Sequence, residues 1–498
     1  DSFNQDLGDW DVSNVTNMAL MFNLNGGFNN GGSPSISGWT TSACTLMYSM
    51  FRAANTFNQP IGSWDVSNVT NIYEMFFDAD SFNQDLGDWD VSNVTNMYRL
   101  FLSANVFNNG GSPAISGWTT SACTNMSEMF YNTPVFNQDI GAWDVSNVTD
   151  MSEMFRNTTL FNNSGSNSIS GWTTSAVTTM SLMFWSSGSF NQDIGAWDVS
   201  NVTDMLGFIG GNSVFNQNVG SWDVANVNDM SSMFAGSTSF NNGGSPSISG
   251  WTTSGVTLMA TMFFNTDAFN QDIGAWDVSN VTNFRNMFDD ATVFNQDLGS
   301  WDVSKMATNG ITSMFQDCTN FNNGGSPAIS GWTTSGATTL SSLFVNSSFD
   351  QDISAWDVSN VTDMGLTFSN TPFNHDISSW DVSNVIYTWF MFRYNSVFNQ
   401  PIGSWDVGSV VDAREMFLNA TAFDQDLGDW NVSGVTNMSQ MFNNSNLSVG
   451  NYNSILTGWT GWDGSGATKT LQSNVTFGVD GLTYSTGTTA DDARNYLL

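Results

Sequence analysis

The chain has 498 residues, and 45 acidic residues against nine Lys and Arg give a formal net charge of −36. This sign disfavours binding to nucleic acid and adsorption to anionic lipid. Charged residues make up only 11% of the chain, against about 25% in ordinary domains. The surface must therefore be built largely from Asn, Ser, Thr, Gly and Asp, and no run approaches the ~18 apolar residues that would span a bilayer.

One motif recurs about eighteen times from residue 1 to about residue 459, and a clean copy runs from Phe136 to Phe155. A period of 24–31 residues between equivalent tryptophans predicts a solenoid, in which each coil buries its apolar side against its neighbours. Asp1 falls inside a repeat, so we expect the chain to be a fragment of a longer protein. The repeat tryptophans are Trp10, Trp39, Trp64, Trp89, Trp118, Trp143, Trp172, Trp197, Trp222, Trp251, Trp276, Trp301, Trp332, Trp356, Trp380, Trp405, Trp430 and Trp459.

The coils come in a short and a long form. The long form carries extra Gly, Ser, Pro and Asn residues before its tryptophan, as in residues 109–113, and these residue types favour turns. The long coils should therefore bulge at one corner while the core positions stay in register. The long coils are those of Trp39, Trp118, Trp172, Trp251, Trp332 and Trp459.

Two kinds of spacing occur within one coil. Trp143-Asp144-Val145 alternates apolar and polar residues, which predicts a short strand. The apolar residues Val148, Met151, Met154 and Phe155 follow at spacings of three, three and one, which predicts one or two helical turns. The fold class expected is an α/β repeat solenoid with one short parallel strand and one short helical segment per coil. The expected core of this coil is Phe136, Ile140, Trp143, Val145, Val148, Met151, Met154 and Phe155.

The order Ile-x-x-Trp-x-Val resembles the strand segment of leucine-rich repeats, and the unit WDVSNVTDM-x-x-MF is similar to the BspA-like bacterial surface repeat. This resemblance covers residues 1 to about 459. It implies a leucine-rich-repeat-like, right-handed solenoid on secreted or cell-surface proteins, with a role in binding or attachment. Residues 460–498 break the repeat and are expected to form a divergent C-terminal cap on the solenoid of residues 1–459.

Residue types that recur at one position of every coil should form columns along the stack. The Asn after Phe, as in Asn83 and Asn137, should face inward at a turn and link one coil to the next. Two Asp columns should face outward, and their stacked charges would repel. Either hydrogen bonds from Ser, Thr and backbone N–H groups or bound Ca²⁺ could relieve this repulsion. The candidate Ca²⁺ ligands are Asp139, Asp144, Asp193 and Asp198.

The positions between and after the two Met residues vary from coil to coil. Tyr, Trp and Arg gather there, and these residues often anchor interfaces. The alternative is that the rings only seal the joints between adjacent coils. The candidate interaction surface is Tyr48, Tyr73, Phe77, Tyr98, Tyr131, Trp185, Trp389, Phe390, Arg393 and Tyr394.

Catalytic chemistry has little support in the sequence. His375 is the one histidine and replaces the usual Gln of the repeat, so no Ser/His/Asp or Cys/His set is possible without it. Cys44, Cys123 and Cys318 are expected to be small buried hydrophobic residues rather than disulfide partners. We expect a protein that is not an enzyme and holds no cofactor other than, at most, Ca²⁺.

The function expected is adhesion or ligand binding by an extracellular or cell-surface module, with a protein or a glycan on another surface as the partner. The alternative is a structural subunit that assembles with copies of itself into a surface or phage fibre. A chain that stays monomeric over a wide concentration range would argue against the second function. Neither function involves nucleic acid or insertion into a membrane.

Overall fold

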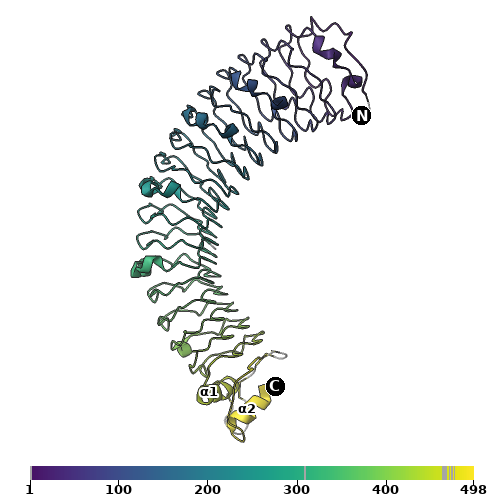
Figure 1. Ribbon diagram of the computed structural model, residues 1–498. Helices are drawn as coiled ribbons and strands as arrows, with labels where there is room; N and C mark the ends of the chain where they lie inside the picture. The colour runs from purple at the N-terminus through teal and green to yellow at the C-terminus, as the bar shows by residue number, and fades with distance from the viewer. Residues whose placement is uncertain are drawn as a thin grey trace. The chain divides into compact units, whose positions relative to one another are not determined.

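A computed structural model describes residues 3–307, 310–461, 468–469, 471–472, 475 and 477–497. The chain divides into two compact units, Asp1–Val256 and Thr257–Leu498. Within each unit successive coils lie side by side as a stack (Figure 1). None of the helices in the described part of the chain combines the length and apolar character needed to cross a membrane.

The backbone of neighbouring coils is joined by a hydrogen-bond ladder that follows the Met-x-x-Met-Phe segment. In the coil of Trp143, every second residue donates its N–H to a carbonyl of the next coil: Met151 to Thr179, Glu153 to Ser181 and Phe155 to Met183, at 2.9–3.3 Å. A parallel bridge between Asp150 and Thr179 begins this ladder. Bridges at the equivalent position recur in both units, and in the described residues they stay isolated instead of extending into strands.

Left-handed residues shape this ladder segment. Two residues per coil, four positions apart, have a positive φ, such as Glu153 at 55° and Asn157 at 57°. The intervening N–H groups close short turns within the coil, from Met154 to the Met151 carbonyl and from Arg156 to the Glu153 carbonyl. A left-handed conformation costs an L-residue roughly 1–2 kcal/mol. The ladder bonds, each contributing about 1 kcal/mol, offset much of this cost.

The predicted strand and helix are therefore wrong as assigned. Trp143-Asp144-Val145 forms no strand, and the segment from Met151 to Phe155 forms no helix. The spacing of three, three and one arises because three-residue turns alternate with left-handed residues, which stops the chain from winding into a helix. The coarser prediction, a repeat solenoid, is confirmed, but its leucine-rich-repeat-like strand is not supported.

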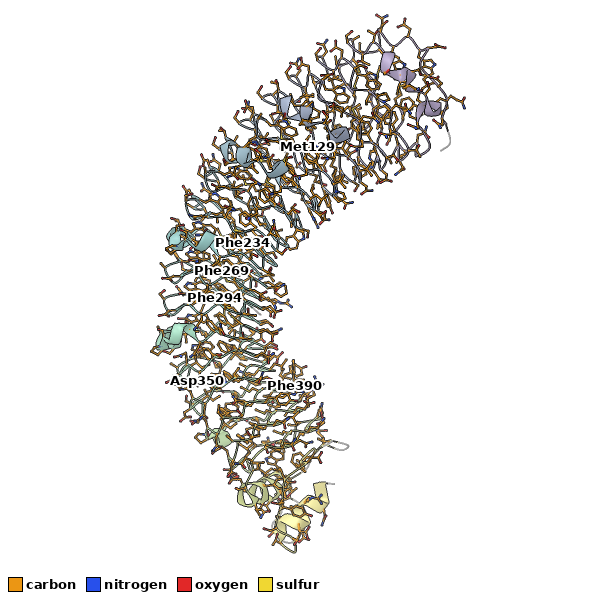
Figure 2. The ribbon with its side chains drawn as sticks, in the orientation of Figure 1. Met129, Phe234, Phe269, Phe294, Asp350 and Phe390 are labelled. Atoms are coloured by element: carbon orange, nitrogen blue, oxygen red, sulfur yellow. The ribbon has the colours of Figure 1, made fainter. Side chains whose placement is uncertain are left out.

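The core of each coil consists of the predicted apolar columns. All eight expected core residues of the Trp143 coil are at most 2% exposed. Phenylalanine rings stack where one coil leads into the next, as Phe76 does on Phe82 at 4.0 Å, and between equivalent positions of successive coils, as Phe76 does on Phe101 at 5.6 Å. Phe269 and Phe294, from successive coils of the second unit, stack in the same way at 5.9 Å (Figure 2). Offset stacking of aromatic rings adds to the energy of their burial.

Tryptophan is suited to its column because its indole N–H finds a partner in the preceding coil at most of these positions, although that of Trp172 is buried without one. Trp143 donates Nε1–H to the Ile115 carbonyl at 3.0 Å, and Trp430 donates to the Ile402 carbonyl at 3.0 Å. A buried donor without a partner would cost about 1–3 kcal/mol. The same bond therefore fixes the register between coils and removes the penalty for burying a polar group.

The Asn and Gln of the FNQ motif link coils as well. The N–H of Asn83 donates to Asn58 Oδ1 at 3.0 Å, and Gln84 Nε2 donates to Asn58 Oδ1 at 2.7 Å and to the Asn58 carbonyl at 3.1 Å. The predicted link from coil to coil is thus present. The Asn side chains do not all face inward, however, since Asn58 is exposed.

Two short 3-10 helices form the corner of each long coil apart from that of Trp459. Buried Asn30 organises the first corner, since its Oδ1 accepts the Leu7 N–H at 2.8 Å and its Nδ2 donates to the Ser33 carbonyl at 2.7 Å. Pro34 begins the second helix, where its missing N–H removes no hydrogen bond. The pairs are η1 (Asn30–Gly32) and η2 (Pro34–Gly38), η3 (Asn109–Gly111) and η4 (Pro113–Gly117), η5 (Asn163–Gly165) and η6 (Asn167–Gly171), η7 (Asn242–Gly244) and η8 (Pro246–Gly250), and η9 (Asn323–Gly325) and η10 (Pro327–Gly331).

The C-terminal part of the second unit departs from this pattern. A single 3-10 helix, η11 (Ile402–Ser404), precedes Trp405, and α1 (Val449–Thr460) replaces the paired corner before and around Trp459. Helix α2 (Thr489–Leu497) packs against α1. Phe477 bridges Met438, and the N–H of Asn444 donates to the Asp480 carbonyl at 3.0 Å, so residues 477–480 pair with the ladder of the preceding coil. The regular coil pattern thus gives way to helix α1 at Val449, and residues 477–480 add to the hydrogen-bond ladder of the preceding coil.

Candidate recognition surface

Each ladder segment presents four positions on the outside of its coil: the two between the Met residues and the two after Phe. In the Trp143 coil these are Ser152, Glu153, Arg156 and Asn157, all half-buried, whereas the intervening Met and Phe residues are fully buried. We call the four columns of outward positions in each unit the variable face. Phe390 of this face and Asp350 of the FNQ side lie on opposite sides of the coils (Figure 2).

Most of the charged residues that do not belong to the repeated motif lie on the variable face. All four glutamates of the chain and six of its nine basic residues occur there. Every one of these glutamates stands at a left-handed position. The residues are Glu74, Glu128, Glu153 and Glu415, with Arg52, Arg99, Arg156, Arg285, Arg393 and Arg414.

In the first unit these charges form a chain of ion pairs across successive coils. Arg52 Nε lies 3.2 Å from Glu74 Oε2. Arg99 lies between two glutamates, with Nη1 3.6 Å from Glu74 Oε1 and Nε 2.9 Å from Glu128 Oε2. Its Nη2 also donates to Glu128 Oε1 at 3.0 Å, so the latter pair is bidentate. Bidentate pairing holds the guanidinium in one orientation.

Aromatic rings alternate with these charges. The rings of Tyr48 and Tyr73 stack at 4.8 Å, and the guanidinium groups of Arg52 and Arg99 lie 4.7 Å and 4.6 Å above the rings of Phe77 and Tyr98. Burial, followed by the neighbouring Glu128, raises the pKa of Tyr98 to about 12. The Tyr98 hydroxyl therefore remains a hydrogen-bond donor throughout the physiological pH range.

The second unit carries an aromatic cluster of its own, formed by Trp389, Phe390, Arg393, Tyr394 and Arg414. Trp389 and Phe390 meet edge to face at 5.4 Å, and Arg393 lies 5.2 Å above Phe390 and 4.5 Å above Tyr394. The Trp389 ring occupies space left by a glycine, because a Cβ at position 365 would come within 2.4 Å of it. The ring of Tyr394 reaches furthest outward, since this residue is 44% exposed.

A depression of about 450 Å³ adjoins this cluster within the second unit. Along it, Asn370 Nδ2 donates to Asn346 Oδ1 at 2.8 Å, and Asn346 Nδ2 donates to Asp317 Oδ1 at 2.6 Å. The amide ladder joins an acidic end to an aromatic end, a mixture suited to polar ligands. Its lining is Gln316, Asp317, Val345, Asn346, Leu366, Ser369, Asn370, Arg393 and Tyr394.

The structure brings the ten predicted interface residues onto the variable face of their own units. Tyr48, Tyr73, Phe77, Tyr98 and Tyr131 lie on four successive coils, with Tyr73 and Phe77 on the same coil, and Tyr131 lies under Arg156 at 5.1 Å. Trp185 stands at the same position as Tyr131, two coils further on. The other four, Trp389, Phe390, Arg393 and Tyr394, belong to the aromatic cluster of the second unit.

The four predicted Ca²⁺ ligands lie outside the variable face and accept hydrogen bonds from their own coil and, for Asp139, also from the next coil. Asp139 accepts bonds from the Gly141 N–H at 3.0 Å and the Ser168 hydroxyl at 2.6 Å, and Asp198 accepts from both the N–H and the hydroxyl of Ser200. Asp144 accepts a bond from the N–H of Ser146, and Asp193 accepts one from the N–H of Gly195. Among the residues that the structure describes, none of these four aspartates belongs to a group of three or more Asp, Glu, His or Cys side chains close enough together to hold a metal ion.

The local bonds lower the pKa of several of these carboxyl groups, as in Asp144 and Asp198, where the Ser hydroxyl is the largest cause. A lowered pKa means that the fold favours the charged form, so the stabilisation is present above the ordinary pKa near 3.8 and is lost as the pH falls through the lower, folded-state value.

We therefore expect a triple variant, Asp144→Asn, Asp198→Asn and Asp357→Asn, to differ from the parent most at neutral pH. The difference in melting temperature should shrink as the pH falls below about 4, because the variant lacks three of the titrating groups. Asn431 already stands at this position and accepts the Ser433 N–H and hydroxyl, so the fold tolerates the change. A difference that stays constant from neutral pH to acid would show that these bonds do not favour the charged form.

Sequence reasoning missed one acidic group on the variable face: Asp289, Asp290 and Asp317. Burial, followed by the charges of Asp290 and Asp317, acts against ionisation and raises the pKa of Asp289 to about 6 despite a hydrogen bond from Asn286. The sequence did contain an indication of this group. The two residues after Phe are both Asp at 289 and 290, where another coil has Arg156 and Asn157, and the next coil has Asp317 at the second of these positions.

The remaining chemically notable residues occupy ordinary repeat positions. His375 takes the Gln position, where its Nε2 lies 3.2 Å from the Asp350 carbonyl oxygen and 3.3 Å from Asp350 Oδ1. Cys44, Cys123 and Cys318 are buried free thiols, as the sequence predicts. Burial raises the pKa of Cys123 to about 11, which opposes formation of a reactive thiolate.

Stacked coils joined by a backbone ladder, with constant apolar columns inside and a variable face outside, define a tandem-repeat protein of the solenoid class. The family model described as "Mycoplasma protein of unknown function, DUF285" matches residues 1–33, 31–112, 89–168, 109–205, 163–247, 242–346 and 338–459. The chain belongs to this family. No curated protein matches it.

Proposed function

We propose that the chain is a non-enzymatic recognition module that binds a protein on another surface through its variable face, in an extracellular or cell-surface setting. The observation that carries this proposal is the gathering of all glutamates, six of nine basic residues and most of the non-core aromatic rings on that face. The rest of each coil repeats, so it contributes the scaffold. Selection for stability alone would not require one face to differ from coil to coil.

The chemistry of this face favours a protein partner. Tyr, Trp and Arg dominate the energetics of protein interfaces, and here they are held by ion pairs and stacking before any partner binds. Arg99 has two carboxylate partners and the Tyr98 ring against it, so it loses little freedom on binding. Preorganised side chains reduce the entropic cost of association. The amide-lined depression of the second unit makes a glycan the alternative partner.

The resemblance to BspA-like surface repeats supports the proposed location, and it rests on the unit WDVSNVTDM-x-x-MF. A surface poor in lysine and rich in Asn, Ser, Thr and Asp is also typical of extracellular repeat arrays. The net charge of −36 disfavours nucleic acid as the partner.

The test is adhesion of protein-coated beads to cultured cells. A double variant, Tyr73→Ser and Tyr98→Ser, installs the residue that neighbouring coils carry at this position in Ser127 and Ser152, so folding should be retained. Loss of two anchor side chains should lower adhesion about tenfold or more. The control is Val106→Ser with Leu160→Ser, which removes side chains that are 44% and 52% exposed outside the variable face.

Treating the cells beforehand identifies the partner. Protease treatment that abolishes adhesion supports a protein partner, and periodate oxidation that abolishes it while protease does not would replace the protein with a glycan. Adhesion that is absent for the parent chain, or equal for the parent and the tyrosine variant, would overturn recognition through this face.

A further inference from the structure

Three carboxylates from two adjacent coils meet on the variable face of the second unit. Asp290 and Asp317 occupy the same left-handed position in successive coils, with φ of 59° and 54°, and Asp289 precedes Asp290. One oxygen from each of the three side chains lies within 4.8 Å of the other two. The ladder sets this approach, because the N–H of Asp290 donates to the Gln316 carbonyl at 2.9 Å.

The second observation is an unsatisfied oxygen inside this cluster. Asp289 is only 4% exposed, and its Oδ1 has no hydrogen-bond partner. Its Oδ2 accepts a bond from Asn286 Nδ2, which orients the carboxylate. Buried polar atoms without partners are costly and rare. The nearby Arg285 does not compensate the charge, since its Nε donates to Asn286 Oδ1 at 3.2 Å and no ion pair among the described residues includes the three aspartates.

We propose that Asp289, Asp290 and Asp317 form a Ca²⁺ site. Hard cations of this size accept six to eight oxygen ligands in irregular geometries, which suits three carboxylates from two coils with water completing the shell. Bound Ca²⁺ supplies the missing partner of Asp289 Oδ1, and its two positive charges reduce the repulsion among the three carboxylates. The smaller Mg²⁺ demands near-octahedral geometry and gives up its water reluctantly, so it should bind more weakly.

This site is separate from the Asp columns that the sequence singled out, and it does not depend on the proposed recognition function. Asp317 connects it to the depression, because the same side chain accepts the Asn346 amide through Oδ1 and lines the wall. Ion binding can therefore be measured on the isolated chain without any knowledge of its partner.

The experiment is calorimetric titration of the full chain with CaCl₂ after treatment with a chelator. The parent should bind one ion at this site with an affinity in the micromolar to millimolar range, about 10⁻⁶–10⁻³ M. The double variant Asp290→Asn and Asp317→Asn should lose this event or weaken it about tenfold or more. Both changes install the residue that adjacent coils carry at this left-handed position, Asn265 and Asn346, so the ladder should form as in the parent.

Two matched controls accompany this variant. Asp357→Asn removes one charge from an outward column of the same unit, and Asp139→Asn with Asp193→Asn removes two charges from the other Asp column. Both should bind Ca²⁺ as the parent does. Parent protein that binds no Ca²⁺ up to about 10 mM, or a double variant that binds it with unchanged affinity, would overturn the site. Circular dichroism of each variant establishes that a lost signal does not come from unfolding.

Discussion

Replacing Trp143 by alanine should destabilise its part of the first unit by about 3–5 kcal/mol. The side chain is 2% exposed, lies 5.7 Å from the Trp118 ring and 6.3 Å from the Phe130 ring, and donates to the Ile115 carbonyl. Alanine leaves a cavity between coils and removes one of the two hydrogen bonds that the Ile115 carbonyl accepts, the other coming from the Trp118 N–H at 3.2 Å. Because coils contact only their neighbours, hydrogen exchange should show the loss of protection centred on residues 115–172.

Two further variants separate the causes. Trp143→Phe retains a ring but loses the N–H donor, and it should cost about 1–3 kcal/mol. Asp144→Asn, at the adjacent exposed position, should change stability by less than about 0.5 kcal/mol. A Trp143→Ala chain with exchange protection equal to that of the parent would contradict the role of the tryptophan column in joining the coils.

Replacing Gly207 by valine should destabilise the first unit by about 3 kcal/mol or more. Gly207 has a φ of 58°, which a β-branched residue adopts only with strain. A Cβ at this position would also come within 2.6 Å of Leu182 Cδ2 and 2.8 Å of Trp185 Cε3. Since the Gly207 N–H donates to the Ser231 carbonyl, relief of the strain would break a ladder bond.

The matched control is Gly188→Val, because Gly188 has no positive φ and an added Cβ there meets no atom within 4 Å. Denaturant unfolding of the two valine variants should separate them by about 2 kcal/mol or more. Equal midpoints for the two would show that the left-handed positions carry no special cost. Glu153 has a φ of 55° at the equivalent position of an earlier coil. Since glycine adopts a positive φ without strain, Glu153→Gly should leave the stability unchanged or increase it.

Much of the core could be predicted from the sequence, because burial of apolar side chains depends mainly on their type and spacing. The columns represented by Phe136, Trp143, Met151 and Phe155 are buried as expected. The backbone of these columns could not be predicted in the same way. The spacing of Met151, Met154 and Phe155 fits a helix on one coil taken alone, and only pairing with the next coil shows that a ladder of alternating turns satisfies the N–H groups instead.

The variable face was predictable as a set of departures from the repeat, but its contacts were not. Glu128 Oε2 meets Arg99 Nε at 2.9 Å across 29 residues of sequence, while Glu153 pairs with Arg156 in its own coil. The choice between such partners depends on how adjacent coils align. The Asp289, Asp290 and Asp317 cluster depends on the same alignment, since 27 residues separate Asp290 from Asp317.

The sequence by itself determined that this is a tandem-repeat solenoid, which columns are buried and which positions are free to vary, because a repeated pattern of apolar spacing can be buried only by stacking. The tertiary structure decided how the backbone of each coil bonds to the next, and therefore which side chains meet across coils. Those contacts depend on a register between segments 24–31 residues apart. The ladder, the indole bonds and the left-handed residues set that register together, and none of them is complete within a single coil.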